Sequence, residues 1–177
     1  MPYPQFLKHN FDCLEIVYFL SQEQSYYGIW FSDETKDGFL TQNYDMLTFG
    51  SEKAASEFIR FHTSYRKPAT TTIYDMDKVQ RMIDLRQPLD ACVILEFWNI
   101  AADLAGSVKT SFLGDLKDDL TDQIYDKLFY GNNLPEINTS GKIYTPQFTE
   151  EEWQKLKDIL TDAISVIMNT FKGITKV

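Results

Sequence analysis

Histidine and cysteine are scarce in this 177-residue sequence, and their scarcity excludes several kinds of site. The two histidines, His9 and His62, are too few for a His-based catalytic triad or a zinc site, so we expect ordinary surface or half-buried residues. The two cysteines, Cys13 and Cys92, lie far apart and match no disulfide framework or metal-ligand spacing. We therefore expect both to be buried as small hydrophobic side chains in a reducing compartment.

The short motifs of common enzymes are also missing. The sequence has no Gly-x-Ser-x-Gly nucleophile motif, no Gly-x-x-x-x-Gly-Lys phosphate loop and no Gly-x-Gly-x-x-Gly dinucleotide loop. We expect no cofactor and no metal ion.

Basic residues are outnumbered, with 17 Lys and Arg against 26 Asp and Glu, which gives a net charge of −9 and a pI near 4.7. Binding to phosphates needs a basic stripe, and the cluster at Arg60–Lys67 is short and diluted by aromatic residues, so we expect no direct binding to nucleic acid. The negative charge would attract a basic protein surface and speed the encounter with it, or it would simply maintain solubility. Charge alone leaves both interpretations open.

Long apolar runs are absent as well. Uninterrupted apolar stretches are only a few residues long, far below the roughly 18 residues that a membrane span needs. The start of the chain, Met1–Lys8, has no basic region, apolar region or cleavage site of a secretory signal. We expect a cytoplasmic protein that is not embedded in a membrane.

Aromatic and β-branched runs dominate the first part of the chain and indicate strands. Phe11–Leu20 and Tyr26–Phe31 predict two strands, and Phe39–Phe49 predicts a third with an interruption near Asn43–Asp45. Short connections favour an antiparallel β-meander, and Thr70–Tyr74 predicts a further strand.

Apolar residues at helical spacing predict two helices within the first half of the chain. One helix is predicted from an N-cap at Ser51 to about Ser64, ended by Pro68. Another is predicted after a cap at Asp75 and is closed by Pro88.

The second half is predicted to be helical. Asp90–Lys109 is apolar on most sides and predicts a central helix that several neighbours contact. A further helix is predicted from near Asp118 to Tyr130, with Gly131 as its left-handed C-terminal cap and Asn132–Pro135 as a turn.

Thr149 and Glu152 form a capping-box pattern that predicts the start of the last helix, which Gly173 stops. These elements together predict an α+β fold in one domain over residues 1–177. An N-terminal antiparallel β-meander with helices, residues 1–88, is expected to pack on a mostly helical half, residues 89–177.

Carboxylates offer the one enzymatic alternative. Glu96 and Asp103 lie two turns apart on one face of the central helix, about 10 Å along its axis. If that face lines a cleft, burial would raise the pKa of both groups and mark a carboxylate-dependent hydrolase. Otherwise the face is the exposed edge of the helix.

A denser cluster of acids occurs in the next helix. Its members, countered by Lys117 and Lys127, are Asp115, Asp118, Asp119, Asp122 and Asp126. Asp118 and Asp119 suit a helix N-terminus, where negative charge is stabilising, but Asp122 and Asp126, at i, i+4 spacing, repel each other by a few tenths of a kcal/mol in an isolated helix. The cluster is either a solvated face or a docking surface for a cationic partner.

A second acidic candidate is the turn that carries Asp33, Glu34 and Asp37, which plain turn chemistry also explains. Aromatic residues make up 15% of the chain, and Tyr125 and Tyr130 near the acid cluster are candidate interface anchors. The sequence does not separate such anchors from core residues.

Several strings in the second half resemble immunity proteins of bacterial contact-dependent growth inhibition systems. They are Phe97-Trp98-Asn99-Ile100 with Asp103-Leu104, then the run from Tyr125 to Pro135, then Tyr144 and Pro146. The resemblance spans roughly residues 90–171 and carries no catalytic signature or toxin-contact residue.

The resemblance implies a cytosolic protein that binds and blocks the C-terminal toxin domain of a cognate exoprotein, often a nuclease. Such toxins tend to have basic surfaces, which suits an acidic partner. We therefore expect a non-enzymatic toxin inhibitor that docks through the acid cluster with Tyr125, or through the turn at Asp33, Glu34 and Asp37. The other non-catalytic alternative is a structural or adaptor protein that binds no toxin.

Overall fold

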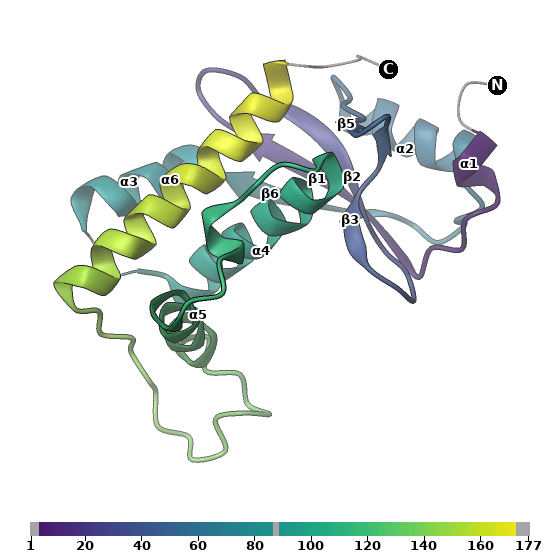
Figure 1. Cartoon of the computed structure of the whole chain (residues 1–177). Coiled ribbons are helices and arrows are strands. Elements are labelled where there is room, and N and C mark those ends of the chain that lie inside the picture. The colour runs from purple at the N-terminus through teal and green to yellow at the C-terminus, as the bar shows by residue number, and fades with distance from the viewer. Residues whose placement is uncertain (1–3, 87–88, 173–177) are drawn as a thin grey trace. The chain divides into compact units, whose positions relative to one another are not determined.

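The chain has the expected α+β architecture, with an antiparallel-rich sheet and helices first and helices alone later (Figure 1). This computed structural model describes residues 4–86 and 89–172. The chain divides into two units. Unit 1 contains residues up to Asp77 together with Gly106–Thr110 and the segment from Met168, and unit 2 contains Lys78–Ala105 and Ser111–Ile167. A single domain over residues 1–177 stays a prediction.

The sheet of unit 1 has the strand order β3-β2-β1-β6 (Figure 1). β1 (Cys13–Leu20), β2 (Tyr26–Ser32) and β3 (Asp37–Phe39) are consecutive and antiparallel, which confirms the meander. β6 (Thr70–Asp75) instead pairs with β1 in parallel, because a helix-containing crossover returns the chain to the same end of the sheet.

The predicted third strand is broken, as its polar interruption suggested. After β3, the chain forms a two-stranded hairpin of β4 (Thr41–Gln42) and β5 (Asp45–Met46). The two residues between them, Asn43 and Tyr44, both have positive φ, 54° and 67°, as a tight hairpin turn requires.

Helix α2 (Glu52–His62) begins where its cap was predicted, since the Ser51 side chain accepts a hydrogen bond from the Ala54 backbone N–H. It ends before Pro68. Thr63 is the C-cap, with extended backbone and its hydroxyl donating to the Ile59 carbonyl at 2.7 Å. The short helix α1 (Pro4–Leu7) completes the N-terminal segment.

The core of unit 1 lies between α1, α2 and the sheet. Its buried apolar residues include Phe6, Leu14, Ile29, Phe49 and Phe58, and the ring centroids of Phe49 and Phe58 are 5.2 Å apart. Burial of large aromatic rings supplies much of the stabilisation in such a core.

Helices α3 (Met76–Leu85) and α4 (Ala91–Val108) follow. α4 begins where a helix was predicted, and the Asp90 side chain accepts a hydrogen bond from the Val93 N–H at 3.2 Å. The predicted stop at Pro88 lies outside the described residues. α4 is long and apolar enough to span a membrane by length and composition, but half of it is buried, as in the core helix of a globular protein.

The last two helices are α5 (Asp119–Gly131) and α6 (Glu150–Lys172). The capping box of α6 is confirmed, because the Thr149 N–H donates to the Glu152 carboxylate at 2.7 Å and the Glu152 N–H donates to Thr149 Oγ1 at 3.2 Å. The stop predicted at Gly173 lies outside the described residues. A long irregular segment joins α5 to α6 (Figure 1).

The predicted left-handed cap at Gly131 is wrong. Gly131 is the last residue of α5, and the positive φ, 52°, belongs to Asn133. Close packing explains the glycine instead, because a Cβ at this position would lie 2.7 Å from Ala91 Cβ and 2.6 Å from Pro146 Cγ.

Substituting Gly131→Ala is therefore expected to lower the free energy of unfolding by about 1–3 kcal/mol, although alanine is the better helix former. Gly106→Ala is the matched control, because Gly106 is exposed in α4 and a Cβ there would meet nothing within 4 Å. It should stabilise by about 0.5–1 kcal/mol. Urea unfolding of both variants measures the difference, and equal signs would refute the packing explanation.

The cysteine prediction is also wrong. Cys13 is half-buried in β1 and Cys92 is exposed on α4. Cys13 lies at the start of its strand and Cys92 lies on the polar side of its helix, so neither position faces the core. The histidines are half-buried, as expected.

Candidate acidic docking surface

Three aspartates of the cluster form an exposed row on α5. Asp119, Asp122 and Asp126 are exposed, whereas Ile124 and Leu128 are buried on the opposite face. Spacings of three and four residues place the three acids on one face. Their side chains make no hydrogen bond or ion pair within the described part of the chain. We call this set, Asp119, Asp122 and Asp126, the acidic row.

Asp118 has a structural task instead. It is the N-cap of α5 and accepts hydrogen bonds from the Thr121 N–H at 2.8 Å and hydroxyl at 2.9 Å. Lys155 of α6 also lies 3.1 Å from Asp118 Oδ2. The Thr121 bonds, and then Lys155, hold the pKa of Asp118 below its usual value. Asp118 is thus engaged within unit 2.

Asp115 stands apart from the acidic row. It ends the short 3₁₀ helix η1 (Leu113–Asp115), ahead of α5, and is exposed as a residue. Partial burial of its carboxyl group raises the pKa of Asp115, against the charge of Lys117. The Asp115 carboxylate therefore becomes protonated at a higher pH than the Asp118 carboxylate does.

The structure shows which of the two candidate tyrosines packs within the chain and which is exposed. Tyr125 is half-buried, its hydroxyl donates to Asn99 Oδ1 at 3.1 Å, and its ring meets the Trp98 ring edge-on at 5.5 Å. Tyr130 is exposed and follows Asp126 by four residues. Tyr125 therefore fixes α5 to α4, and Tyr130 is the aromatic residue available to a partner.

A buried ion pair fixes α5 to the start of α6. The Lys127 Nζ lies 2.6 and 2.7 Å from the two Glu152 oxygens, and it donates to the Gln147 carbonyl at 2.9 Å. The side chain of Glu152 is only 6% exposed. Lys127, together with the capping-box bonds from Thr149, lowers the pKa of Glu152. The acidic row is therefore carried on a rigidly held helix.

The loop between α5 and α6, residues 132–149, is organised by two asparagines. Asn133 donates to the carbonyls of Gly131 and Tyr144 and accepts from the Tyr144 N–H at 2.7 Å. Asn138 donates to Asn133 Oδ1 and to the Lys142 carbonyl at 2.6 Å. The sequence indicated only a turn here, because nothing in the pattern shows which backbone groups these side chains reach.

The alternative pair on α4 does not share a buried cleft. Glu96 is exposed and lies 3.4 Å from the Cys92 sulfur, whereas Asp103 is half-buried and has interactions of its own. Partial burial and the hydrogen bond to Glu96 raise the pKa of the Cys92 thiol. The burial that a catalytic role of the pair requires is missing at Glu96. Within the described residues, no group of three His, Cys, Asp or Glu side chains is placed to hold a metal ion.

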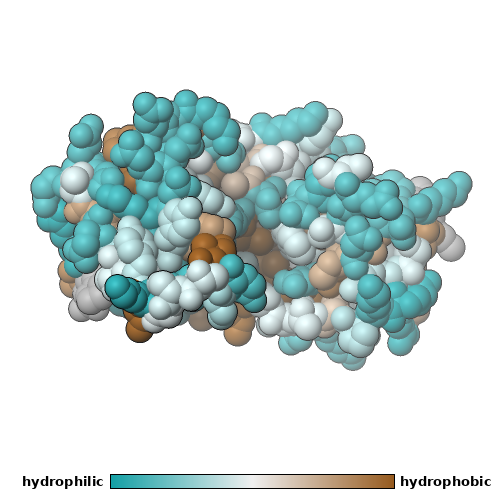
Figure 2. Space-filling model, turned by 90° about the horizontal axis from the view of Figure 1, so that it is seen from below, coloured by the Kyte–Doolittle hydropathy of each residue, from teal (hydrophilic) through white to brown (hydrophobic). Residues whose placement is uncertain are grey.

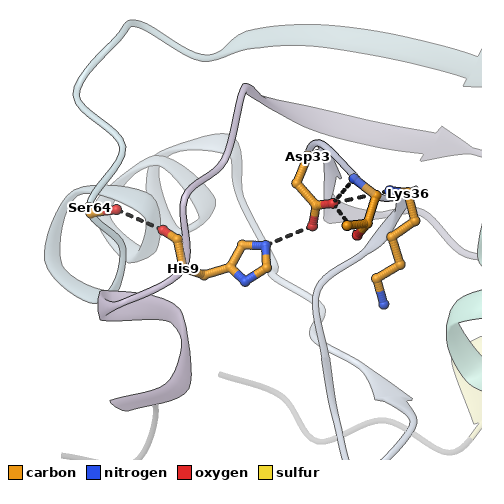
Figure 3. Close-up of polar contacts among 5 residues, drawn as sticks. His9, Asp33, Lys36 and Ser64 are labelled. Carbon is orange, nitrogen blue, oxygen red and sulfur yellow. Dashed lines mark hydrogen bonds and ion pairs between the residues drawn. The ribbon is translucent and has the colours of Figure 1, made fainter.

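The second acidic candidate, the turn after β2, is built around Asp33 (Figure 3). Its Oδ1 accepts from the N–H groups of Thr35 and Lys36, and His9 Nε2 lies 2.7 Å from its Oδ2. Its side chain is 6% exposed. The hydrogen bonds from Thr35, followed by those from His9 and Lys36, hold the pKa of Asp33 far below its usual value.

Asp33 is thus committed to turn chemistry, while Glu34 and Asp37 are exposed beside it. A shallow hollow of about 210 Å³ adjoins the turn and is lined by His9, Asn10, Asp33, Glu34 and Thr35. Ser64 supports it from α2's C-terminal side by donating to the His9 carbonyl at 2.8 Å (Figure 3). The turn fixes the N-terminal segment to the sheet.

Stability is expected to fall in acid because of these carboxylates. Asp33, Asp118 and Glu152 each have a folded-state pKa below the unfolded value, so their contribution is complete above about pH 5 and is lost as pH falls through the folded pKa. Urea unfolding at pH 6, 4 and 3 measures this loss. Asp33→Asn should show a shallower fall than the wild type, and an equal slope would contradict the assigned role.

Comparisons with known proteins give no family. No protein-family model and no curated protein matches the chain. Among solved structures, the crystal structure of the SatS C-terminal domain in complex with bromine is similar, with a TM-score of 0.42 and 12% identity, covering 84% of this chain and 90% of that chain. A likeness of this size carries no argument about function.

Proposed function

We propose that this chain is an immunity protein that binds a cognate toxin domain in the cytoplasm and covers the toxin's basic active site, without catalysing a reaction. The observation that carries the proposal is the acidic row, three carboxylates exposed on one face of α5 and unpaired within the described chain. The resemblance of residues 90–171 to immunity proteins supports the same function.

The chemistry of a nuclease explains why such a surface would inhibit it. A nuclease holds phosphates with lysine and arginine, so an acidic face competes for the groups that bind the substrate. Net charge of −9 adds long-range attraction and speeds the encounter. A cationic partner would also relieve the repulsion between Asp122 and Asp126, which amounts to a few tenths of a kcal/mol in an isolated helix.

The rigid mounting of the acidic row is a second support. α5 is capped by Asp118 and tied to α6 through Lys127 and Glu152. A surface that is already ordered loses little conformational entropy when it binds.

Co-expression tests the proposal. The C-terminal domain of the protein encoded immediately upstream should stop growth when expressed alone, and the chain should restore growth and copurify with that domain. The triple variant D119N/D122N/D126N should protect poorly. A matched variant that neutralises three exposed acids elsewhere, E23Q/E34Q/D45N, should protect fully.

The same assay separates inhibition from catalysis. The double variant E96Q/D103N should protect as the wild type does, since no step requires these carboxylates. Loss of protection by a folded E96Q/D103N protein, or failure of the chain to copurify with the upstream domain, would reject the proposed function.

A further inference from the structure

Large apolar side chains gather at the surface where the acidic row ends. Tyr130 is 54% exposed, and the loop 132–149 adds Leu134 at 42%, Ile137 at 41%, Ile143 at 83% and Tyr144 at 41%. The view in Figure 2, which looks toward this loop, shows hydrophobic atoms at the surface among hydrophilic ones. Contiguous exposed apolar patches rimmed by polar residues are typical of interaction sites.

The patch is hollowed into a pocket of about 370 Å³. Its apolar lining is made by Phe129, Tyr130, Leu134, Ile137 and Tyr144, and Lys142 is among its polar lining residues. This volume lies near the lower end of the range for ligand pockets, roughly 300–1,000 Å³, so the pocket suits one large side chain better than an extended ligand.

The pocket is held open by the loop's own hydrogen bonds. Asn133 bridges the Gly131 carbonyl at 2.8 Å to both backbone groups of Tyr144, and Asn138 ties Asn133 to the Lys142 carbonyl. These bonds hold the backbone of Tyr144, one of the lining residues, in place. A preformed pocket avoids the entropy loss of ordering a loop during binding.

Charge indicates what enters the pocket. Tyr130 follows Asp126 by four residues, so it lies one turn farther on the same face of α5, and the acidic row leads directly to the pocket. A segment that placed an apolar side chain in the pocket would run its neighbouring residues along Asp126 and Asp122. Lysine or arginine is the complementary residue at those positions.

We infer that the pocket receives one aromatic side chain of a basic segment in the partner, while flanking lysine or arginine residues pair with the acidic row. The inference rests on the proposed function, because it describes the part of that partner that is held here. A buried aromatic anchor beside charge pairs is a frequent arrangement of an interface hot spot.

Three short peptides test the inference on the full chain by NMR. The probes are acetyl-Lys-Lys-Trp-Lys-Lys-amide, the same peptide with alanine in place of tryptophan, and the same peptide with glutamate in place of every lysine. The Lys/Trp peptide should shift the amide resonances of Tyr130, Ile137 and Tyr144 and should bind about tenfold tighter than the alanine peptide. The glutamate peptide should not bind.

Two variants localise the effect. Ile137→Ala removes part of the lining and should weaken binding of the Lys/Trp peptide about fivefold. Ile143→Ala is the matched control, because Ile143 is more exposed and does not line the pocket. It should leave binding unchanged. The amide spectrum of each variant reports whether it is folded.

Three results would overturn the inference: equal affinity of the tryptophan and alanine peptides, equal affinity of the lysine and glutamate peptides, or shifts confined to residues 119–126. The failure of the proposed function is distinguishable. A chain that binds the Lys/Trp peptide in the pocket but protects against no toxin refutes only the immunity function. A chain that protects against the toxin but binds none of the peptides refutes only the pocket inference.

Discussion

Replacing Glu152 with alanine is expected to lower the free energy of unfolding by about 3 kcal/mol. The substitution removes the carboxylate that pairs with Lys127 at 2.6 Å and also the capping-box acceptor of the Thr149 N–H. It leaves the Lys127 ammonium, whose side chain is only 29% exposed, with a single backbone acceptor. Breaking a largely buried pair on one side usually costs this much. Urea unfolding measures the change.

A second substitution at Glu152 separates the contribution of its charge from that of the helix cap, and a substitution at Glu150 serves as a control. Glu152→Gln keeps a side-chain acceptor for the cap and should be less damaging than Glu152→Ala. Glu150→Ala, which removes an acid that is 86% exposed in its pair with Arg86, should change stability by less than about 0.5 kcal/mol. Equal losses for Glu150→Ala and Glu152→Ala would show that the Lys127 pair does not anchor α5.

Reversing the charge of the acidic row is expected to weaken binding to the proposed basic toxin domain about 100-fold. The variant D122K/D126K would place two cations against a cationic surface, and like charges across an interface oppose binding strongly. Titration calorimetry with the upstream domain measures the dissociation constant. Circular dichroism verifies that α5 is retained.

The matched control carries the same change of net charge in unit 1. E23K/E34K replaces two exposed acids, one of them in the turn after β2 that is the second candidate for docking. It should weaken binding only slightly, through the loss of long-range attraction. Strong weakening by E23K/E34K with little effect of D122K/D126K would move the docking surface to that turn.

Local capping chemistry made much of the fold predictable. Ser51 and Thr149 cap their helices as the sequence indicated, because a cap is a contact over three residues and leaves a readable pattern. The order of strands and helices followed from the same kind of short-range signal. The parallel pairing of β6 with β1 did not, because it depends on contacts between distant segments.

The errors have a common physical origin. Gly131 was interpreted as a left-handed cap, but its role is the close approach of Ala91 and Pro146, which are distant in sequence. The two cysteines were expected in the core by residue type, although their faces of β1 and α4 point elsewhere. Long-range packing decided both cases.

The sequence predicted the acidic row of the candidate site but not the pocket beside it. Spacing alone placed Asp119, Asp122 and Asp126 on one face, but it could not show that Asp118 is a cap or that Tyr125 bonds to Asn99. The pocket beside Tyr130 had no sequence signal. It depends on the side chains of Asn133 and Asn138, whose backbone partners lie up to 11 residues away.

The salt dependence of the association rate tests the central idea most directly. Stopped-flow mixing of the chain with the upstream domain, over a range of ionic strength, gives the rate constants for the wild type and for D122K/D126K. The wild-type rate should fall steeply as salt rises, and the variant should be slower with a much shallower slope. A wild-type rate that ignores salt, or the same slope in both proteins, would contradict docking through the acidic row.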